Sequence, residues 1–384
     1  MTTLDSRPTP SVPPRLTGVA PPVTVIVPTR NEQGNVAELL DRLVPALPAG
    51  SEVLFVDDSD DGTPAAIEAS ACGHPVPVRT HHREPGERSG GLGGAVATGL
   101  SLATRDWCVV MDGDLQHPPE LVPELVRVGQ AGRSQLVVAS RYDGGGDAES
   151  FGRARAFAST WATHLAKAFF PHRLAAITDP MSGFFAVRRD AVDPDALRPN
   201  GFKILLEIAV RGGPLRTSEL SFHFGRRFAG ESKASLREGV RLVVLLARLW
   251  FDVRGESRGA RMAGFAAVGV SGLLVNTLAL WVATGLAGLH YAVGATIATV
   301  VSTTWNWGVL EALVYPASKG PSTVRRFLAF AGLNGAALAL RVPLIALLVE
   351  RAGANYLLAN LVSLVALFAA RFVVTDTMIF RRPR

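Results

Sequence analysis

Apolar and polar positions follow two different patterns along the chain. From Val23 to about Phe224, short apolar runs alternate with amphipathic stretches. Four of these runs are rich in Val, Ile and Leu and are bounded by turn residues: VTVIVPT (23–29), EVLFVDD (52–58), WCVVMDG (107–113) and QLVVASR (135–141). Nearly continuous apolar strands that alternate with helices are typical of a parallel sheet with helices on both faces. The first pattern therefore predicts an α/β domain.

The second pattern begins near Arg261 and predicts a membrane domain. Long apolar stretches replace the short ones, and each is close to the ~20 residues that cross a bilayer. They are rich in Gly, Ala, Ser and Thr, which lets membrane helices pack closely. We expect four spans, at residues 262–286, 291–314, 326–349 and 355–377. The alternative is a large helical bundle in a soluble protein.

Charged residues around these spans indicate an orientation. The stretches before the first span, between the second and third, and after the fourth are basic, whereas the other two loops carry no net charge. The positive-inside rule then places both termini and the α/β domain in the cytoplasm. Arg341 lies well inside the third span, so we expect it to face the interior of the bundle. Arg371 is nearer the cytoplasmic end, and we expect its side chain to extend to the interface.

Two further segments complete the predicted domain organisation. Residues 1–22 are polar and proline-rich and show no secretory signal, which favours a disordered tail. Residues 231–261 place leucines and valines between arginines, which predicts interfacial amphipathic helices; a surface helix packed on the α/β domain is the alternative. The α/β domain then covers residues 23–230, and the four-helix transmembrane domain covers residues 262–384.

Composition narrows the choice of partners. Of the 384 residues, 48% are hydrophobic and only 19% are charged, and the mean hydropathy is +0.24. The formal net charge of +6 suits nucleic acid, anionic lipid or phosphorylated substrates. Because the basic residues follow the predicted membrane boundary, the sequence favours lipid and phosphorylated substrates over nucleic acid. Cys72 and Cys108 show neither metal-ligand spacing nor a disulfide framework, which fits a reducing compartment.

Two aspartates one residue apart lie at the end of the run at residues 107–113 and directly after it. Asp112 and Asp114 repel each other unless a cation or strong donors lie between them, and Gln116 adds a neutral oxygen two residues further on. Hard oxygen ligands with room for substrate phosphates favour Mg²⁺ or Mn²⁺ over zinc. His117 is a further candidate ligand, although a turn histidine packed on its neighbours is the more common case. A surface turn is the alternative for the whole motif.

Polar residues follow other predicted strands as well. Pro28, Arg30 and Glu32 lie at the end of the first run, and Asp57 and Asp58 lie at the end of the second. Carboxylates at neighbouring strand ends can accept hydrogen bonds from the base and ribose of a nucleoside, although helix N-caps use the same residues. The glycine-rich stretch RSGGLGGAVATGL resembles a phosphate loop but matches neither the P-loop nor the dinucleotide fingerprint.

Arginines and small polar residues recur in the second half of the α/β domain. They are Arg141, Arg153, Arg155, Ser159, Asp179, Ser182, Arg226, Arg227 and Lys233. Isolated arginines are usually solvated surface charges. Several of these adjoin small residues and strand ends, which is compatible with a site for two phosphorylated substrates, because the planar guanidinium suits phosphate.

Seven motifs occur in the order typical of family 2 glycosyltransferases: VIVPTRNE, VDDSDDGT, MDGDLQHPPE, SRY, TDPMSGFFAVRR, GFKILLEI and RRFAGESK. The combination of DLQHPPE, GFKILLEI and GESK resembles more narrowly the dolichyl-phosphate (polyprenyl-phosphate) mannose synthases. This resemblance covers nearly all of residues 23–235. The four-span region resembles the GtrA-like membrane domain that some of these synthases carry.

The resemblance implies a GT-A fold, which is a Rossmann-like α/β domain, and it implies roles for the matching residues. The nucleotide sugar would be bound by Pro28, Glu32, Asp57, Asp58, Asp112, Arg227 and Lys233. A divalent cation, Mg²⁺ or Mn²⁺, would be bound by Asp112, Asp114 and Gln116. The acceptor phosphate would be bound by Arg141, Arg155 and Ser159. The residues with catalytic roles would be Asp114, Arg141 and Arg155.

The chain departs from the family's pattern at two positions that bear on the nucleotide sugar. The family usually has an aromatic residue between the Thr and Asn of the first motif, where this chain has Arg30. The family's glycine-rich stretch often carries a lysine, which is absent here and leaves Arg88 as the candidate substitute.

The implied reaction is an inverting transfer of mannose from GDP-mannose to polyprenyl phosphate at the cytoplasmic face of a prokaryotic plasma membrane. No general base is needed, because a phosphate monoester is mostly dianionic near neutral pH, with a second pKa of about 6. Two alternatives stay open: a glucosyltransferase that uses UDP-glucose, and a non-enzymatic lipid-linked sugar transporter or scaffold with a degenerate head. The intact D-x-D-x-Q motif argues against degeneracy. The sequence leaves the oligomeric state open.

Overall fold

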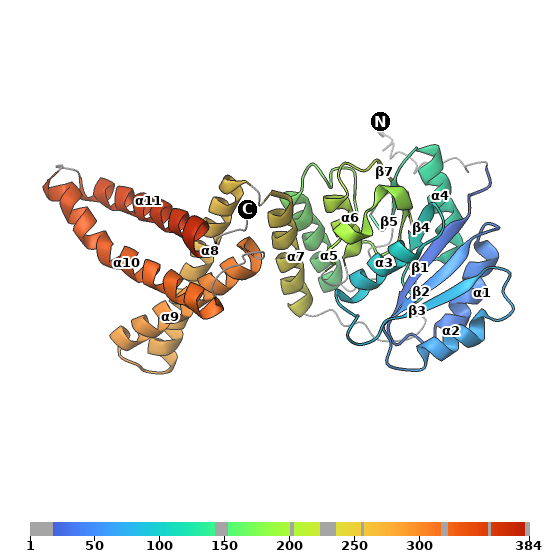
Figure 1. Cartoon of the computed structure of the whole chain (residues 1–384), viewed down its shortest axis with the longest axis horizontal. Coiled ribbons are helices and arrows are strands. Elements are labelled where there is room, and N and C mark those ends of the chain that lie inside the picture. The colour runs from blue at the N-terminus through green and yellow to red at the C-terminus, as the bar shows by residue number, and fades with distance from the viewer. Residues whose placement is uncertain are drawn as a thin grey trace, which may run out of the picture. The chain divides into compact units, whose positions relative to one another are not determined.

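The chain forms two compact units, Met1–Leu249 and Trp250–Arg384 (Figure 1). The structure, a computed structural model, describes residues 18–142, 153–199, 203–222, 236–254, 257–315, 322–351 and 355–380. Most of the predicted tail therefore lies outside the described residues. The finer division at residues 230 and 261 stays a prediction.

A mixed seven-stranded sheet forms the centre of the first unit (Figure 1). Its strands are β1 (Val23–Thr29), β2 (Glu52–Asp57), β3 (Val78–His82), β4 (Trp107–Val110), β5 (Leu136–Ser140), β6 (Phe185–Arg188) and β7 (Thr217–Ser221). Their order is β3-β2-β1-β4-β6-β5-β7. The α/β prediction is confirmed.

One strand corrects the expectation of a parallel sheet. All neighbouring strands are parallel except β6, which pairs antiparallel with both β4 and β5. The chain enters β6 from the loop that contains Asp179 and Gly183, and this loop lies at the edge where β4 and β5 end. A strand that starts at that edge must run back through the sheet.

Helices cover both faces of the sheet. One face packs against α1 (Val36–Ala46), α2 (Thr63–Ala71) and α4 (Val122–Ala131), which share a buried apolar cluster with β1, β2 and β4. The other face packs against α3 (Gly91–Leu102). A Cβ on Gly99 of α3 would lie 2.4 Å from Ile26 Cγ2, so glycine lets this helix approach β1 closely.

The described part of the first unit contains further helices beside these. They include α5 (Arg153–Phe169), α6 (Ile204–Arg211) and the 3₁₀ turns Pro119–Leu121, Arg189–Ala191 and Pro194–Ala196. Helix α7 (Leu236–Arg254) occupies most of the predicted interfacial segment as a single helix and crosses the boundary between the two units.

The second unit contains four long helices: α8 (Arg258–Trp281), α9 (Tyr291–Val309), α10 (Thr323–Glu350) and α11 (Tyr356–Val374). Three of these helices continue as π-helical turns, over Val282–Leu286, Leu310–Val314 and Thr375–Ile379. Within the described ranges, three helical segments are long and apolar enough to cross a membrane: Arg258–Leu286, Thr323–Glu350 and Tyr356–Ile379. The second predicted span, residues 291–314, is also helical, but α9 carries several hydroxyl side chains and Asn306, so its crossing of the membrane stays a prediction.

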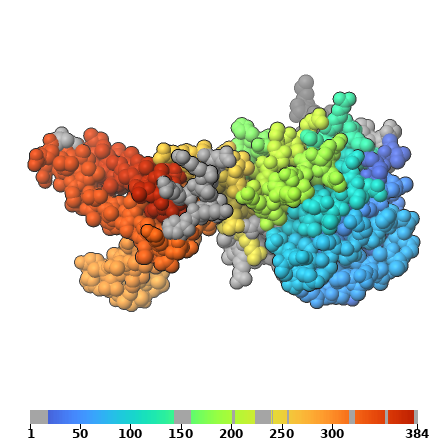
Figure 2. Space-filling model, in the orientation of Figure 1, coloured from blue at the N-terminus to red at the C-terminus, as the bar shows by residue number. Residues whose placement is uncertain are grey.

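Apolar surface distinguishes the second unit from the first. Leu273, Leu274, Val342 and Val365 are each at least 60% exposed, and they belong to the yellow-to-red segment in Figure 2. Soluble domains seldom expose so many large aliphatic side chains along whole helices. A hydrocarbon environment would make this exposure favourable, which supports membrane insertion of the unit.

An ionic cluster joins the first and last helices of this unit. Arg261 on α8 donates from Nε to Asp376 Oδ1 (2.5 Å) and from Nη2 to Asp376 Oδ2 (3.1 Å). The hydroxyl of Tyr315 donates to Asp376 Oδ1 (3.1 Å), and the Tyr315 ring stacks on Phe380 with centroids 4.7 Å apart. Asp376 therefore connects two segments that lie 115 residues apart in the chain.

The two intramembrane arginines each contact an asparagine on the neighbouring helix. Arg341 on α10 donates to Asn360 Oδ1 (3.0 Å) on α11, so it has the partner that an interior position requires. Arg371 on α11 donates to Asn334 Oδ1 (3.2 Å) on α10. The prediction that Arg371 extends to the interface is therefore wrong, because an acceptor is available on the neighbouring helix.

Candidate active site

The candidate site lies at the edge of the sheet where β1, β2, β4 and β5 end. The chain leaves these strands at Thr29, Asp57, Val110 and Ser140. In open α/β sheets, ligands bind outside the carboxyl ends of the strands. Most of the site residues predicted from the sequence follow directly after these four strands, and the structure brings their loops together.

Asp57 connects three strand ends. Its carboxylate is fully buried and accepts hydrogen bonds from Thr29 Oγ1 (2.7 Å) and Ser59 Oγ (2.6 Å). Nδ1 of His82, the last residue of β3, lies 2.7 Å from Asp57 Oδ2. Asp57 therefore holds the ends of β1, β2 and β3 in register, and both of its oxygens have protein partners.

Asp58 forms a bidentate ion pair with Arg83. Arg83 donates from Nε to Asp58 Oδ1 (2.7 Å) and from Nη2 to Asp58 Oδ2 (2.5 Å), and both side chains are buried. Arg83 also donates to the carbonyl oxygen of Gly91 (3.0 Å) at the start of α3. Sequence reasoning missed Arg83, because it follows the edge strand β3, whose polar sequence gave no strand signal.

The other residues predicted to bind nucleotide surround this pair. Arg88 donates to Asp60 Oδ1 (2.5 Å) and to the carbonyl oxygen of Arg83 (2.9 Å), so it connects the glycine-rich stretch to the loop after β2. Arg30 is exposed, and Pro28 is buried within β1. The Glu32 backbone N–H donates to Thr63 Oγ1 (3.0 Å), which joins the loops after β1 and β2.

Asp112 and Asp114 form a tight turn after β4. The backbone N–H of Gln116 donates to Asp114 Oδ1 (3.1 Å), and Leu115 between them adopts a left-handed conformation with φ +62°. Such a backbone costs a leucine about 1–2 kcal/mol. Burial of the Leu115 side chain in the apolar core offsets this cost and holds the turn in place.

His117 supports this turn from behind. Its Nδ1 accepts the backbone N–H of Asp112 (3.1 Å), and its ring stacks on Phe184 with centroids 5.1 Å apart. Burial lowers the pKa of His117 to about 4, so the ring is neutral at physiological pH. Because the lone pair of Nδ1 already accepts a hydrogen bond, the geometry favours a packed turn histidine over a metal ligand at Nδ1.

Gly183 lies against the carboxylate of Asp112. A Cβ at this position would lie 3.0 Å from Asp112 Oδ2 and 3.3 Å from His117 Cε1. Glycine therefore leaves the space that the Asp112 carboxylate occupies. Sequence reasoning did not identify Gly183 as part of the site, because it is more than seventy residues from Asp112 and no local signal connects them.

Arg141 faces the same turn from the end of β5. It donates from Nε to Asp179 Oδ2 (2.6 Å) and from Nη2 to Asp179 Oδ1 (2.9 Å), and Asp179 is fully buried. Burial is the largest influence and lowers the pKa of Arg141, but the hydrogen bond to Asp179 and the charges of Asp179 and its neighbours together outweigh burial, so the pKa lies above its ordinary value. The negative charge of Asp112 is one of these charges, which is consistent with a guanidinium near the Asp112 side of the turn.

The predicted acceptor residues are only partly described. Arg155 and Ser159 lie on α5, as the helical spacing predicted, but their side chains lie outside the described residues. Arg227 and Lys233 also lie outside them. The roles of these four residues stay predictions.

The oxygen donors at the turn fit a hard divalent cation. No group of three or more His, Cys, Asp or Glu side chains with metal-binding geometry occurs in the described part of the chain. Asp112, Asp114 and Gln116 offer two carboxylates and one amide oxygen. Gly183 has no side chain that would press on the Asp112 carboxylate. A donor set of this size suits Mg²⁺ or Mn²⁺ that completes its coordination with water and substrate phosphates.

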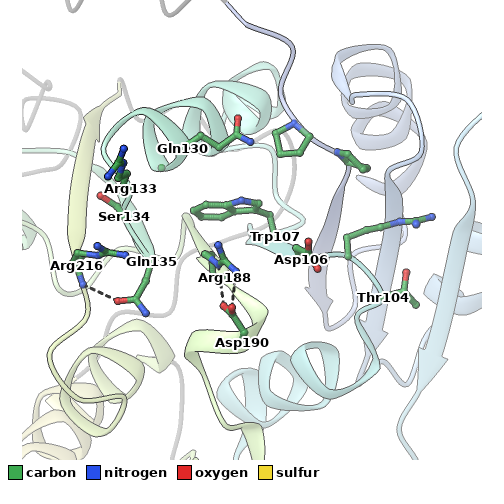
Figure 3. Close-up of a pocket in the computed structure, with 14 residues that line it drawn as sticks. Thr104, Asp106, Trp107, Gln130, Arg133, Ser134, Gln135, Arg188, Asp190 and Arg216 are labelled. Atoms are coloured by element: carbon green, nitrogen blue, oxygen red, sulfur yellow. Dashed lines mark hydrogen bonds and ion pairs between the residues drawn. The ribbon is translucent and has the colours of Figure 1, made fainter.

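A separate cavity of about 860 Å³ lies at the opposite edge of the sheet (Figure 3). Trp107, Arg133, Arg188 and Arg216 line it, and Arg188 pairs with Asp190. This edge gathers the C-terminal ends of α3 and α4, whose carbonyl groups carry partial negative charge that arginines offset. None of the predicted site residues lines the cavity, so we place the candidate active site at the carboxyl edge instead.

Comparisons with known proteins identify the family of the chain. The family model "Glycosyl transferase family 2" matches residues 24–194, and the model "GtrA/DPMS, transmembrane domain" matches residues 264–380. The chain belongs to the family 2 glycosyltransferases and combines their catalytic domain with a GtrA/DPMS transmembrane domain. The resemblance stated from the motifs is therefore confirmed.

The most similar relatives have one activity in common. A dolichol-phosphate mannosyltransferase from Pyrococcus furiosus is 35% identical over 356 residues, which cover 92% of this chain and 97% of that protein. An undecaprenyl-phosphate mannosyltransferase from Micrococcus luteus is 33% identical over 251 residues, which cover 62% of this chain and 98% of that protein. Among solved structures, glucosyl-3-phosphoglycerate synthase from Mycobacterium tuberculosis with Mn²⁺ and UDP-glucose is 22% identical, with a TM-score of 0.44 over 61% of this chain and 79% of that chain.

Proposed function

We propose that this glycosyltransferase transfers mannose from GDP-mannose to polyprenyl phosphate, with inversion at the sugar carbon, at the cytoplasmic face of the membrane. The observation that carries the proposal is the pairing of the Asp112–Asp114 turn with the Arg141–Asp179 ion pair at one sheet edge. Similarity to mannosyltransferases along nearly the whole chain supports the choice of sugar and acceptor.

Asp112, Asp114 and Gln116 would hold the divalent cation, Mg²⁺ or Mn²⁺. When bound, the cation would neutralise charge on the leaving diphosphate. The protein prepares this site in advance: His117 fixes the backbone of Asp112, and the buried side chain of Leu115 fixes the turn. Such preorganisation avoids the cost of rearranging dipoles during the reaction.

Arg141 would bind phosphate oxygens next to the turn. Its bidentate contact with buried Asp179 fixes the plane of the guanidinium. Arg155 and Ser159 would hold the acceptor phosphate from α5, where their i, i+4 spacing places them on one helix face. Arg227 and Lys233 would complete the positive charge around the two substrates.

The nucleoside would bind over the loops after β1 and β2. Because Asp57 and Asp58 already bind protein donors, we assign their carboxylates mainly to shaping this surface, with Pro28, Arg30, Glu32 and Arg88 around it. The acceptor phosphate is mostly dianionic at neutral pH, so it can attack the sugar carbon without a general base. The protein then contributes position and charge stabilisation.

Lipid-extractable product tests the proposal directly. Membranes that contain the full chain are incubated with polyprenyl phosphate and radiolabelled GDP-mannose or UDP-glucose, and label in the organic phase is counted. We expect label from GDP-mannose only. Label from UDP-glucose alone would replace the proposal with glucosyl transfer, and no label from either donor would favour a transporter or scaffold.

A further inference from the structure

Arg371 is a cation without a carboxylate partner inside a membrane-crossing segment. It lies in Tyr356–Ile379, which is long and apolar enough to cross a bilayer. Its Nη1 donates to Asn334 Oδ1 (3.2 Å), and its Nε is buried and makes no hydrogen bond. Among the residues that the structure describes, Arg371 forms no ion pair. A guanidinium has five N–H donors, so one amide oxygen leaves most of them unsatisfied.

Arg341 and Arg371 each donate to one asparagine, but of these two only Arg371 has a buried Nε without a hydrogen bond among the described residues. Two other arginines of the same unit have carboxylate partners. Arg261 pairs with Asp376, and Arg326 pairs with Glu311. Each of these charges is neutralised within the chain. An unneutralised charge in hydrocarbon is costly, and intramembrane arginines therefore face a partner or a polar cavity. The described residues therefore supply no counter-charge for Arg371, and an anion from the membrane is the partner that we consider.

Arg371 and Asn334 lie at similar distances from neighbouring ends of their two helices. Arg371 lies eight residues before Ile379, which is about 12 Å along a helix. Asn334 lies eleven residues after Thr323, the matching end of the antiparallel helix α10, which is about 16 Å. The guanidinium thus contacts an acceptor at least as deep as its own backbone.

The amide of Asn334 is itself fixed. Its Nδ2 donates to the carbonyl oxygen of Phe330 (2.8 Å), one turn earlier on α10, so its Oδ1 is the atom that faces Arg371. The pair lies between α10 and α11, which pack side by side (Figure 1). Asn334 therefore orients the guanidinium without neutralising it.

We propose that Arg371 and Asn334 form a binding site for the phosphate of an acidic membrane lipid. Phosphate matches the planar fork of arginine, and it is the anionic group that a bilayer supplies. Two sources share this chemistry: bulk acidic phospholipid and polyprenyl phosphate. The site lies in the membrane unit, and its existence does not depend on the mannosyl transfer proposed above.

Lipid retention by the full chain tests the site. The wild-type chain and Arg371→Gln are equilibrated in mixed micelles with phosphatidylglycerol, undecaprenyl phosphate or phosphatidylcholine, and bound lipid is measured by native mass spectrometry. We expect Arg371→Gln to bind at least one of the two acidic lipids about tenfold less tightly, because it loses a charge-assisted contact. Binding of phosphatidylcholine should not change.

Two further variants make the result specific. Arg351→Gln removes an exposed arginine at the end of α10, so it matches the charge change and should retain acidic lipid as the wild type does. Asn334→Leu keeps the charge but removes the orienting amide, and we expect a smaller loss of acidic lipid. This variant also tests the site if Arg371→Gln does not fold.

A loss confined to undecaprenyl phosphate supports the site with that occupant, and a loss of phosphatidylglycerol supports it with bulk lipid. Equal retention by folded Arg371→Gln and wild type, or an equal loss in Arg351→Gln, would overturn the site. Sugar transfer is not measured, so a failure of the proposed reaction would leave this result intact.

Discussion

Substitution of Gly183 tests the placement of the candidate active site most sharply. In Gly183→Ala the new Cβ would lie 3.0 Å from Asp112 Oδ2, whereas ordinary contacts begin at 3.4 Å. The Asp112 carboxylate must therefore move away by a few tenths of an ångström. The new Cβ cannot move away instead, because His117 Cε1 would lie only 3.3 Å from it. A misplacement of about 1 Å can cost a hundredfold in rate. We therefore expect the turnover of Gly183→Ala to fall about tenfold.

The assay is mannosyl transfer measured over a series of Mn²⁺ concentrations. Because Asp112 is displaced and not lost, higher Mn²⁺ should recover part of the activity, and the thermal stability should change little. Gly86→Ala is the matched control, since nothing lies within 4 Å of the added Cβ. Activity of Gly183→Ala equal to that of Gly86→Ala at limiting Mn²⁺ would refute the assignment of Asp112 to the cation.

Further predictions concern the same unit. Asp114→Ala should abolish transfer, and EDTA should do so reversibly; full activity of Asp114→Ala at saturating Mn²⁺ would contradict the metal site. Arg155→Ala should lower transfer roughly a hundredfold, as loss of one transition-state contact does, with GDP-mannose affinity nearly unchanged. Arg155→Lys should recover little of the transfer activity, because an ammonium group cannot reproduce the forked donors of a guanidinium. If Arg155→Ala instead weakens GDP-mannose binding and keeps its affinity for lipid phosphate, the role assigned to Arg155 is wrong. Burial raises the pKa of Cys108 to about 12, while Cys72 is exposed, so iodoacetamide at pH 8 should label only Cys72 in the folded chain; labelling of Cys108, followed by peptide mass spectrometry, would contradict its position in β4.

The central strands could be predicted because their whole surface is buried. Every residue of β1, β2 and β5 is buried, and continuous apolar runs reveal such strands in the sequence. The edge strands β3 and β7 expose part of their side chains and carry polar residues, so they gave no comparable signal. Strand β6 has only four residues, and its direction depends on where the preceding loop ends.

Individual site residues could be predicted only where chain neighbours define them. Asp112 and Asp114 share one turn, so their chemistry was visible in the sequence. The partners of Asp58 and Arg141 were not, because Arg83 and Asp179 reach them from loops 25 and 38 residues away. The sequence predicted that Asp58 binds a ligand, whereas in the structure its carboxylate accepts hydrogen bonds from Arg83. Tertiary contacts decide whether such a carboxylate binds a ligand or another residue of the chain.

Asp376 has a consequence for how the chain is made. Arg261 lies on the first helix of the second unit, and its counter-ion follows 115 residues later. During synthesis, α8 therefore leaves the ribosome well before the residue that neutralises it exists. The unit can close its ionic junction only after almost the whole polypeptide has been translated. Premature termination before Asp376 would then leave an open helix assembly exposed to quality-control proteases, even though every residue of the candidate active site had already been made.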